Sequence, residues 1–217
     1  MKDAVLIINE YLKTPKFHEI HSWLVEAANK YGIQLHIQSN SEILATYPVP
    51  IQKDNGSNQD TVVFFWDKDI RLASYLEDMG YTVFNSSQSI QACDDKSITH
   101  RILTNGGIPM PKTVLAPMTY SRIGYTNYNY LVNVMEILKF PMVVKECFGS
   151  FGEQVYLVHS KEELIEQVEH IGAKPMLFQE YIASSHGRDI RLHVVGDKVV
   201  AGMNRYSDSE DFRANIS

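Results

Sequence analysis

Short apolar runs alternate with stretches of helical periodicity in the first part of the chain. The runs, which are typical of buried strands, cover residues 4–8, 33–37, 61–66 and 81–84. Apolar residues repeat at helical spacing over residues 17–31 and 70–79, and a glycine follows each stretch. A short helix is also expected at residues 39–45, and Asp67 is expected to cap the helix that starts near residue 70. Strands that alternate with helices predict a parallel sheet covered by helices on both faces.

The second part of the chain is predicted to mix helices with hairpins. Helices are expected at residues 95–105, 131–138 and 160–172, and strands at residues 113–115, 141–145, 155–158 and 176–182. Residues 188–195 alternate strictly between polar and apolar side chains, and Gly196-Asp197 turns them back into a strand at residues 199–203. This last hairpin has one apolar face that needs a partner layer. We therefore expect the sequence to be a fragment of a longer protein.

Composition and charge narrow the classes of function. The chain has 217 residues, 44% hydrophobic and 21% charged, as in soluble globular proteins of one or two domains. Its formal net charge is −6 and it has no basic run, which argues against a nucleic-acid partner. The apolar run at the N-terminus is too short for a signal peptide or a membrane span, and Cys93 and Cys147 form neither a disulfide framework nor a zinc cluster. We therefore expect a cytoplasmic protein without a membrane partner.

The strongest chemical signal lies in residues 140–158. A buried strand that carries Lys145 runs into a turn with Gly149 and Gly152, and a second strand follows. A strand lysine beside a glycine loop is a recurring way to hold phosphates, because backbone N–H groups and the ammonium both face anionic oxygens. A surface hairpin whose lysine reaches water is the alternative. The order of lysine and loop does not fit a protein kinase, and no Gly-Lys-Ser/Thr opens a helix as in a P-loop.

Charged side chains of both signs follow this hairpin along the chain. They are Glu180, Asp189, Arg191, Arg205, Asp211 and Arg213. Carboxylates can accept hydrogen bonds from ribose hydroxyls, and arginines can clamp a transferring phosphoryl group. A solvated sheet face with weak cross-strand ion pairs is the alternative interpretation for any one of them. The tyrosine-rich residues 120–130 are expected to form a loop between packed elements rather than an aromatic ligand platform.

Four stretches together resemble the ATP-grasp fold and, within it, the RimK-like family of α-L-glutamate ligases. They read NSSQSIQACDDKSITHRILTNGGIPMPKT, FPMVVKECFGSFGEQVYLV, FQEYIASSHGRDIRLHVVGDKVVAGMNR and DFRANIS. The resemblance runs from residue 85 to the last residue, and residues 1–84 match only in layout. It implies an α/β protein in which a small Rossmann-like pre-ATP-grasp domain (1–93) precedes the ATP-binding lobe (94–178) and an incomplete C-terminal lobe (179–217).

The resemblance also implies a set of site residues. Those expected to bind ATP are Lys96, Lys145, Phe148, Gly149, Ser150, Gly152, Gln179, Glu180, Tyr181, Ile182, Asp189 and Asn215. The two lysines and the loop would contact the phosphates, residues 179–182 the adenine, and Asp189 the ribose. The residues expected to be catalytic are Arg205, which would orient the acyl phosphate or the acceptor, and Arg213, which with Asn215 would reach the terminal phosphates.

Members of this family join a carboxylate to an amine. ATP phosphorylates the carboxylate, the amine attacks the acyl phosphate, and the tetrahedral intermediate collapses to an amide. The resemblance therefore implies ATP, a carboxylate and an amino acid as partners, with glutamate or another amino acid added to a protein or a small molecule. A nucleotide-binding module without turnover, or an ATP-grasp ligase with a different acceptor, remains an alternative. The sequence leaves both substrates and the oligomeric state open, with a homo-oligomer among the options.

The sequence departs from the family pattern in two places. Gln154 stands where the family's loop usually has another glycine. The family's magnesium ligands, an Asp, a Glu and an Asn, are expected beyond Ser217, so no metal ligand is assigned within this chain. Magnesium is nevertheless the expected cofactor of ATP, and this 217-residue chain is itself expected to be inactive.

Overall fold

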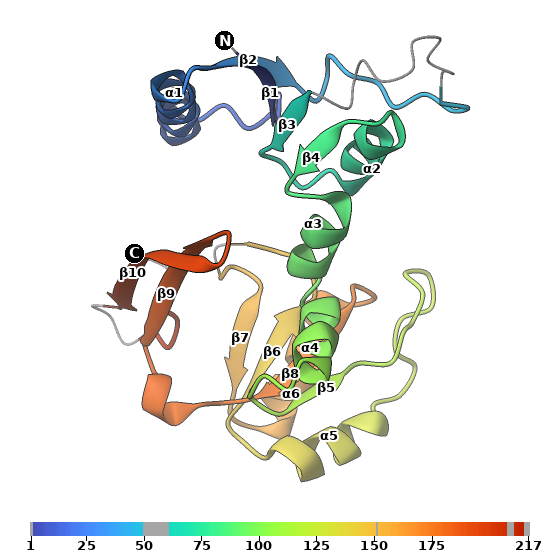
Figure 1. The fold of residues 1–217 in the computed structure, drawn as a ribbon. Helices are drawn as coiled ribbons and strands as arrows, with labels where there is room; N and C mark the ends of the chain where they lie inside the picture. Colours follow the sequence, from blue (N-terminus) through green and yellow to red (C-terminus); the bar gives the residue numbers. More distant parts are fainter. Residues whose placement is uncertain (1, 50–60, 151, 208–210, 215–217) are drawn as a thin grey trace. The chain divides into compact units, whose positions relative to one another are not determined.

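The computed structural model describes residues 2–49, 61–150, 152–207 and 211–214. It divides into two compact units, Met1–Cys93 (unit 1) and Asp94–Ser217 (unit 2), shown in Figure 1. The sequence predicts a domain boundary at the same residue. Its further division of unit 2 after residue 178 stays a prediction.

Unit 1 contains a four-stranded parallel sheet with strand order β2-β1-β3-β4. Its elements are β1 (Lys2–Ile8), α1 (Pro15–Lys30), β2 (Ile33–Ser39), β3 (Val62–Phe65), α2 (Ile70–Asp78), β4 (Thr82–Phe84) and α3 (Ser87–Asp94). On β1, Leu6 packs with Leu24 of α1, whereas its neighbour Ile7 packs with Leu72 of α2. Because successive strand residues face opposite sides, the two helices cover opposite faces of the sheet. The predicted parallel sheet with helices on both faces is confirmed.

Two local predictions in unit 1 are wrong. Residues 39–45 do not form a helix, because β2 extends further than expected and a turn follows it. The cap of α2 is Asp69 and not Asp67: the Asp69 carboxylate accepts hydrogen bonds from the backbone N–H groups of Arg71 and Leu72, both at 3.1 Å. Asp67 lies two residues before this position, so its side chain is not the one that satisfies the first turn of the helix.

Unit 2 is built on a four-stranded antiparallel sheet with strand order β5-β8-β6-β7. Its elements are α4 (Lys96–Asn105), β5 (Thr113–Leu115), α5 (Tyr130–Leu138), β6 (Met142–Glu146), β7 (Val155–Val158), α6 (Lys161–Ile171), β8 (Met176–Glu180), a 3₁₀ turn (Ala183–Ser185), β9 (Arg188–Val195) and β10 (Lys198–Tyr206). Strands β6 and β7 form the expected hairpin around the glycine loop. Strands β9 and β10 form a separate two-stranded hairpin.

The two faces of the sheet in unit 2 have different roles. Val144 of β6 and Phe178 of β8 are fully buried in a core that α5 and α6 complete. Their neighbours along the same strands, Val143, Lys145 and Gln179, face the opposite side. One face therefore holds the core of the unit, and the other remains open to a cavity.

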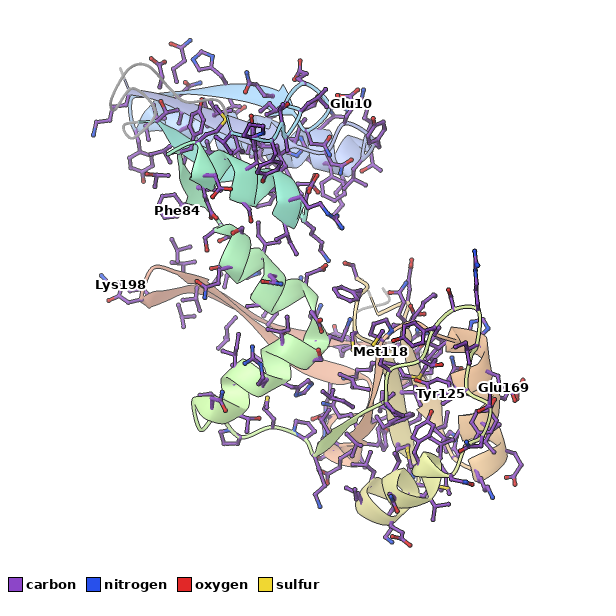
Figure 2. All side chains as sticks on the ribbon, turned by 90° about the vertical axis from the view of Figure 1, so that its right-hand side faces the viewer. Glu10, Phe84, Met118, Tyr125, Glu169 and Lys198 are labelled. Atoms are coloured by element: carbon purple, nitrogen blue, oxygen red, sulfur yellow. The ribbon has the colours of Figure 1, made fainter. Side chains whose placement is uncertain are left out.

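The tyrosine-rich segment before α5 packs onto this core. The Tyr125 hydroxyl donates a hydrogen bond to the Pro117 carbonyl at 2.7 Å, and the Tyr128 hydroxyl donates to Glu169 at 3.0 Å. Figure 2 shows Tyr125 on the side of unit 2 that carries Glu169. The Tyr130 ring lies 6.3 Å from the Phe178 ring, and burial raises the pKa of Tyr130. The segment is thus a loop between packed elements, as predicted.

The β9–β10 hairpin exposes its apolar side chains. Ile190, Leu192 and Val194 alternate with polar residues along β9, and all three are more than half exposed. This agrees with the apolar face expected from the sequence. Among the described helices, none combines the length and the hydrophobicity that crossing a membrane requires.

Replacing Phe178 with Ala tests the core of unit 2. The side chain is 0% exposed on the central strand β8, so we expect the substitution to lower the free energy of unfolding by about 3–5 kcal/mol. The matched control is Phe148→Ala, at a site that is 45% exposed, where the expected loss is below about 1 kcal/mol. Guanidinium chloride unfolding followed by circular dichroism measures both changes. Fluorescence from Trp23 and Trp66, both in unit 1, reports that unit separately. Equal effects of the two variants would contradict this packing.

Candidate functional site

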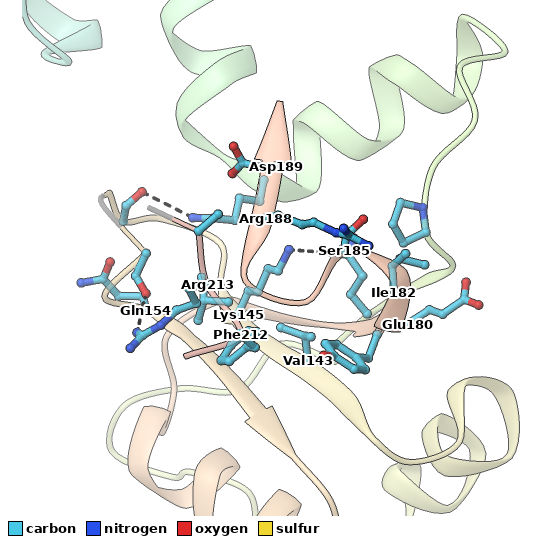
Figure 3. A pocket seen from close by; sticks show the side chains of 18 of the residues that line it. Val143, Lys145, Gln154, Glu180, Ile182, Ser185, Arg188, Asp189, Phe212 and Arg213 are labelled. Carbon is cyan, nitrogen blue, oxygen red and sulfur yellow. Dashed lines mark hydrogen bonds between the residues drawn. The ribbon is translucent and has the colours of Figure 1, made fainter. Parts of the chain in front are cut away.

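A cavity of about 430 Å³ opens on the face of the unit 2 sheet that α5 and α6 do not cover. Small-molecule sites have volumes of this order. Its walls come from α4, β6, the glycine loop, β8 with the segment after it, the β9–β10 hairpin and residues 212–214 (Figure 3). All the site residues implied by the family resemblance line this cavity except two, whereas Arg191 and Asp211, named above for their charge, do not line it. Phe148 lies outside the lining, and Asn215 lies outside the described residues.

Lys145 lies at the centre of the cavity floor. Its ammonium donates a hydrogen bond to Gln179 Oε1 at 2.5 Å. Burial lowers the pKa of Lys145, and the nearby charge of Lys96 lowers it further. Lys96 in turn reaches the carbonyl oxygens of Cys147 and Gly149, both at 3.4 Å, from the first turn of α4. The ammonium groups of Lys96 and Lys145 are near enough to repel each other. They provide a site for a polyanion, whose charge would relieve this repulsion.

The glycine loop adopts backbone conformations that other residues avoid. Gly149 has a φ of +136° and Gly152 a φ of +79°. A Cβ atom on Gly149 would overlap the end of the Gln154 side chain, which fills the space beside the loop. The Gln154 Oε1 atom is buried and accepts no hydrogen bond from any described residue. The position that departs from the family pattern is therefore part of the loop's packing.

Arg213 joins the glycine loop to the end of the described chain. Its Nη1 donates a hydrogen bond to the Gly152 carbonyl at 2.9 Å, and its Nε and Nη2 donate to the two carboxylate oxygens of Asp211 at 3.0 and 2.8 Å. These side-chain hydrogen bonds and a backbone one from Arg213 lower the pKa of Asp211 to about 2. The guanidinium is thus fixed at the edge of the cavity.

A second arginine–carboxylate pair connects the strands of the hairpin. Arg205 of β10 lies opposite Asp189 of β9 in the strand register. The Arg205 Nε donates to Asp189 Oδ1 at 2.7 Å, and its Nη2 donates to Oδ2. Both side chains line the cavity. The residue expected to bind ribose and the residue expected to be catalytic are therefore hydrogen-bonded to each other.

The segment after β8 forms the wall where adenine is expected. The Glu180 backbone N–H donates to the Lys112 carbonyl at 2.8 Å, and the Glu180 carboxylate accepts from the Lys112 backbone N–H at 3.1 Å. The Tyr181 hydroxyl is hydrogen-bonded to His186 Nδ1, and its ring meets the Phe212 ring edge-on at 6.5 Å. These contacts hold Glu180 and Tyr181 in place, so this wall of the cavity carries polar and apolar groups side by side.

Several lining residues were not predicted from the sequence. Beyond Gln154, they are Pro111, Val143, Val155, Ser185, Arg188, Phe212 and Ala214. For Val143 a signal was present, because it lies two residues before Lys145 on the same strand face. Arg188, which donates two hydrogen bonds to the Ser184 carbonyl, carried no motif that would distinguish it.

The expectation that this chain supplies no metal ligands can be compared with the described residues. In that part of the chain, no group of three or more His, Cys, Asp or Glu side chains is arranged to hold a metal ion. The magnesium expected from the sequence resemblance stays a prediction.

Arg213→Gln tests the contact between Arg213 and Asp211. Without the guanidinium, we expect the pKa of Asp211 to rise from about 2 toward the ordinary value of about 3.9. In the parent protein, a carboxyl pKa lowered by folding stabilises the folded state at pH values above the ordinary pKa. This stabilisation is lost as the pH falls toward 2, the pKa of Asp211 in the folded state. Carboxyl NMR of protein labelled at aspartate measures the shift. Arg205→Gln is the control, since that guanidinium binds Asp189 and should leave the Asp211 pKa unchanged. If the Asp211 pKa in Arg213→Gln equals that of the parent, the guanidinium is not what lowers it.

Comparison with known proteins gives the site a family context. The family model of the RimK-like ATP-grasp domain matches residues 93–217. Human beta-citrylglutamate synthase B is 34% identical over 186 residues, which are 84% of this chain and 45% of that protein. Human N-acetylaspartylglutamate synthase A is 34% identical over 189 residues, which are 86% of this chain and 45% of that protein. The chain thus spans about half the length of the curated relatives it matches.

The crystal structure of RimK domain protein ATP-grasp from Sphaerobacter thermophilus has the same fold. It aligns with a TM-score of 0.70 at 19% identity, and the alignment covers 96% of this chain and 75% of that one. This confirms the expected fold class, an α/β protein with a small parallel domain followed by an ATP-grasp domain. ATP-grasp proteins bind ATP, so the family also accounts for a cavity with a lysine-bearing strand and a glycine loop. The chain belongs to the RimK-like ATP-grasp family.

Proposed function

We propose that this chain is the ATP-binding part of an ATP-dependent carboxylate–amine ligase. The observation that carries the proposal is the charge of the cavity. Its lining includes five cationic side chains, Lys96, Lys145, Arg188, Arg205 and Arg213, and only two carboxylates, although the formal net charge of the chain is −6. A cationic cavity in an acidic protein attracts a polyanion such as a nucleoside triphosphate.

The lining supports a division of roles along the nucleotide. Lys145 and Lys96 lie beside the glycine loop and would bind phosphate oxygens, with Lys145 keeping its hydrogen bond to Gln179 and using its other N–H groups for the phosphate. Tyr181 and Ile182 would contact the adenine, and Asp189 would accept hydrogen bonds from ribose hydroxyls. Phe148 and Asn215 keep their expected roles as proposals only.

The reaction would proceed through an acyl phosphate. The carboxylate oxygen attacks the γ-phosphorus of ATP and ADP leaves. The neutral amine nitrogen then attacks the acyl carbon, and inorganic phosphate leaves with the proton that the nitrogen loses as the amide forms. Arg205 and Arg213, at the edge of the cavity, would stabilise the negative charge that develops on the phosphoryl and acyl oxygens.

Glutamate is the amine that the relatives favour. Both relatives are named as synthases of glutamate conjugates, one of citrate and one of N-acetylaspartate. We therefore infer an amino acid, glutamate first, as the amine and a small molecule or a protein as the carboxylate. A cytoplasmic location is also proposed, and the cysteine content supports it.

Magnesium would neutralise phosphate charge in such a reaction. The described residues do not offer the ion a set of three ligands, so they do not fit a resident metal site. The alternative of a nucleotide-binding module without turnover uses the same cavity and predicts bound ATP without release of ADP.

Lys145→Ala tests the phosphate role. Loss of a charge-assisted contact should weaken the binding of a non-hydrolysable ATP analogue by about 10- to 100-fold, since such contacts contribute about 1.5–3 kcal/mol. Lys174→Ala is the matched control, because Lys174 pairs with Glu146 in the same unit and does not line this cavity. Calorimetric titration with and without magnesium gives both affinities, and circular dichroism verifies folding. Parental affinity in Lys145→Ala would exclude the phosphate role.

A further inference from the structure

We propose that His100 is a positioning residue for Lys145, that it acts through Gln179, and that it does so only as a neutral imidazole with its proton on Nδ1. The proposal deepens the proposed function, on which it rests for the role of Lys145 in binding phosphate.

Four elements meet at the Gln179 side chain. Gln179 of β8 accepts a hydrogen bond from Lys145 of β6 at 2.5 Å through Oε1. Its Nε2 lies 2.9 Å from Thr113 Oγ1 of β5 and 3.2 Å from His100 Nε2 of α4. Gln179 is buried, with 6% of the residue exposed, so each hydrogen-bonding group of its carboxamide needs a partner within the protein. One amide therefore connects a helix to the lysine of the cavity floor.

The chemistry of the partners fixes every proton in this group. An ammonium has donors only, so the Gln179 oxygen must face Lys145 and the amide NH₂ must face the other way. The Thr113 hydroxyl already donates to the Pro111 carbonyl at 2.9 Å, so toward Gln179 it accepts. The second amide proton can then go only to His100 Nε2, which must carry a lone pair. The His100 proton therefore resides on Nδ1, which is buried and makes no hydrogen bond to any described residue.

The surroundings of His100 favour this neutral form. Burial lowers the pKa of His100, and the charge of Lys145 on β6 lowers it further. Arg101 of the same helix and Lys112 of the connector line a second cavity together with His100, so further cations lie on this side. On β8, the Glu180 carboxylate accepts a hydrogen bond from the Lys112 backbone rather than from the imidazole.

Protonation of His100 would break the arrangement. An imidazolium would place an N–H group opposite the Gln179 NH₂, two donors facing each other. Rotating the amide by 180° would satisfy His100 but would turn the NH₂ toward the Lys145 ammonium. A protonated His100 and the hydrogen bond from Lys145 to Gln179 therefore exclude each other. Acidification below the ordinary histidine range releases Lys145 from its position.

NMR of the nucleotide-free protein tests the tautomer directly. With ¹⁵N-labelled histidine, long-range correlations at about pH 7.5 should show the Nδ1–H tautomer for His100, and a titration should give a pKa below the ordinary value of about 6.5. His100→Gln assigns the signals among the eight histidines. The Gln179 side-chain amide signals should titrate with the same midpoint in the parent and should not do so in His100→Gln. An Nε2–H tautomer, or a Gln179 amide that titrates identically in both proteins, would overturn the proposal.

Two variants extend the test to nucleotide binding. His100→Gln keeps an acceptor that does not titrate, so it should bind the ATP analogue as the parent does at about pH 7.5 and more tightly than the parent at a pH below the His100 pKa that the NMR titration gives. His100→Lys supplies a permanent donor and charge and should bind about tenfold more weakly at both values. Equal affinities of all three proteins at both values would overturn the proposal. If no protein binds nucleotide, the proposed function fails, whereas the tautomer and the Gln179 titration still decide the role of His100.

Discussion

The alternation of side chains along β6 and β8 is the constraint on which unit 2 depends. Each strand directs one set of residues into the core with α5 and α6 and the next set into the cavity. Val144 therefore fixes the position of Lys145, its neighbour on β6. Phe178 does the same for Gln179, its neighbour on β8. A shift of one residue would exchange the two faces of a strand, and it would place Lys145 of β6 or Gln179 of β8 in the core.

The cavity lining has more cationic side chains than carboxylates, so its cations cannot all form ion pairs within the lining. Lys145 depends on one neutral amide, Lys96 on backbone carbonyls, and Arg213 on a carboxylate and the carbonyl of Gly152. Holding cations near one another in this way opposes folding, and an anionic ligand would offset that repulsion. Nucleotide binding would then stabilise the fold by an amount that grows with the logarithm of the ligand concentration above the Kd, which links the site to the stability of unit 2.

The sequence predicted the parts of the fold and the site that short-range patterns encode. Lys145, Gly149 and Gly152 stood out because a strand, a lysine and two glycines follow one another within one hairpin. The parallel sheet of unit 1 was predicted because each strand and helix carries its own periodicity. The family resemblance then supplied residues that no local pattern marks, and most of these do line one cavity.

The remaining features depend on contacts between distant segments. His100 and Gln179 are 79 residues apart, and nothing in either neighbourhood announces their meeting. Arg213 reaches the carbonyl of Gly152 across 61 residues. Near the start of α2, the choice between Asp67 and Asp69 depended on the residue at which the helix begins, which periodicity does not define to the residue.

The Asp189–Arg205 pair has a consequence for the entropy of binding. In forming two hydrogen bonds with each other, the side chains lose rotamer freedom during folding and not when a ligand arrives. The two hydrogen bonds of the pair leave further donors and acceptors for a ligand, since a guanidinium has five N–H donors and a carboxylate can accept about four hydrogen bonds. A ligand that brings hydroxyls to Asp189 and anionic oxygens to Arg205 would find both groups already ordered. The affinity of this end of the cavity would then depend less on immobilising flexible side chains and more on how well the ligand's shape matches a fixed pair.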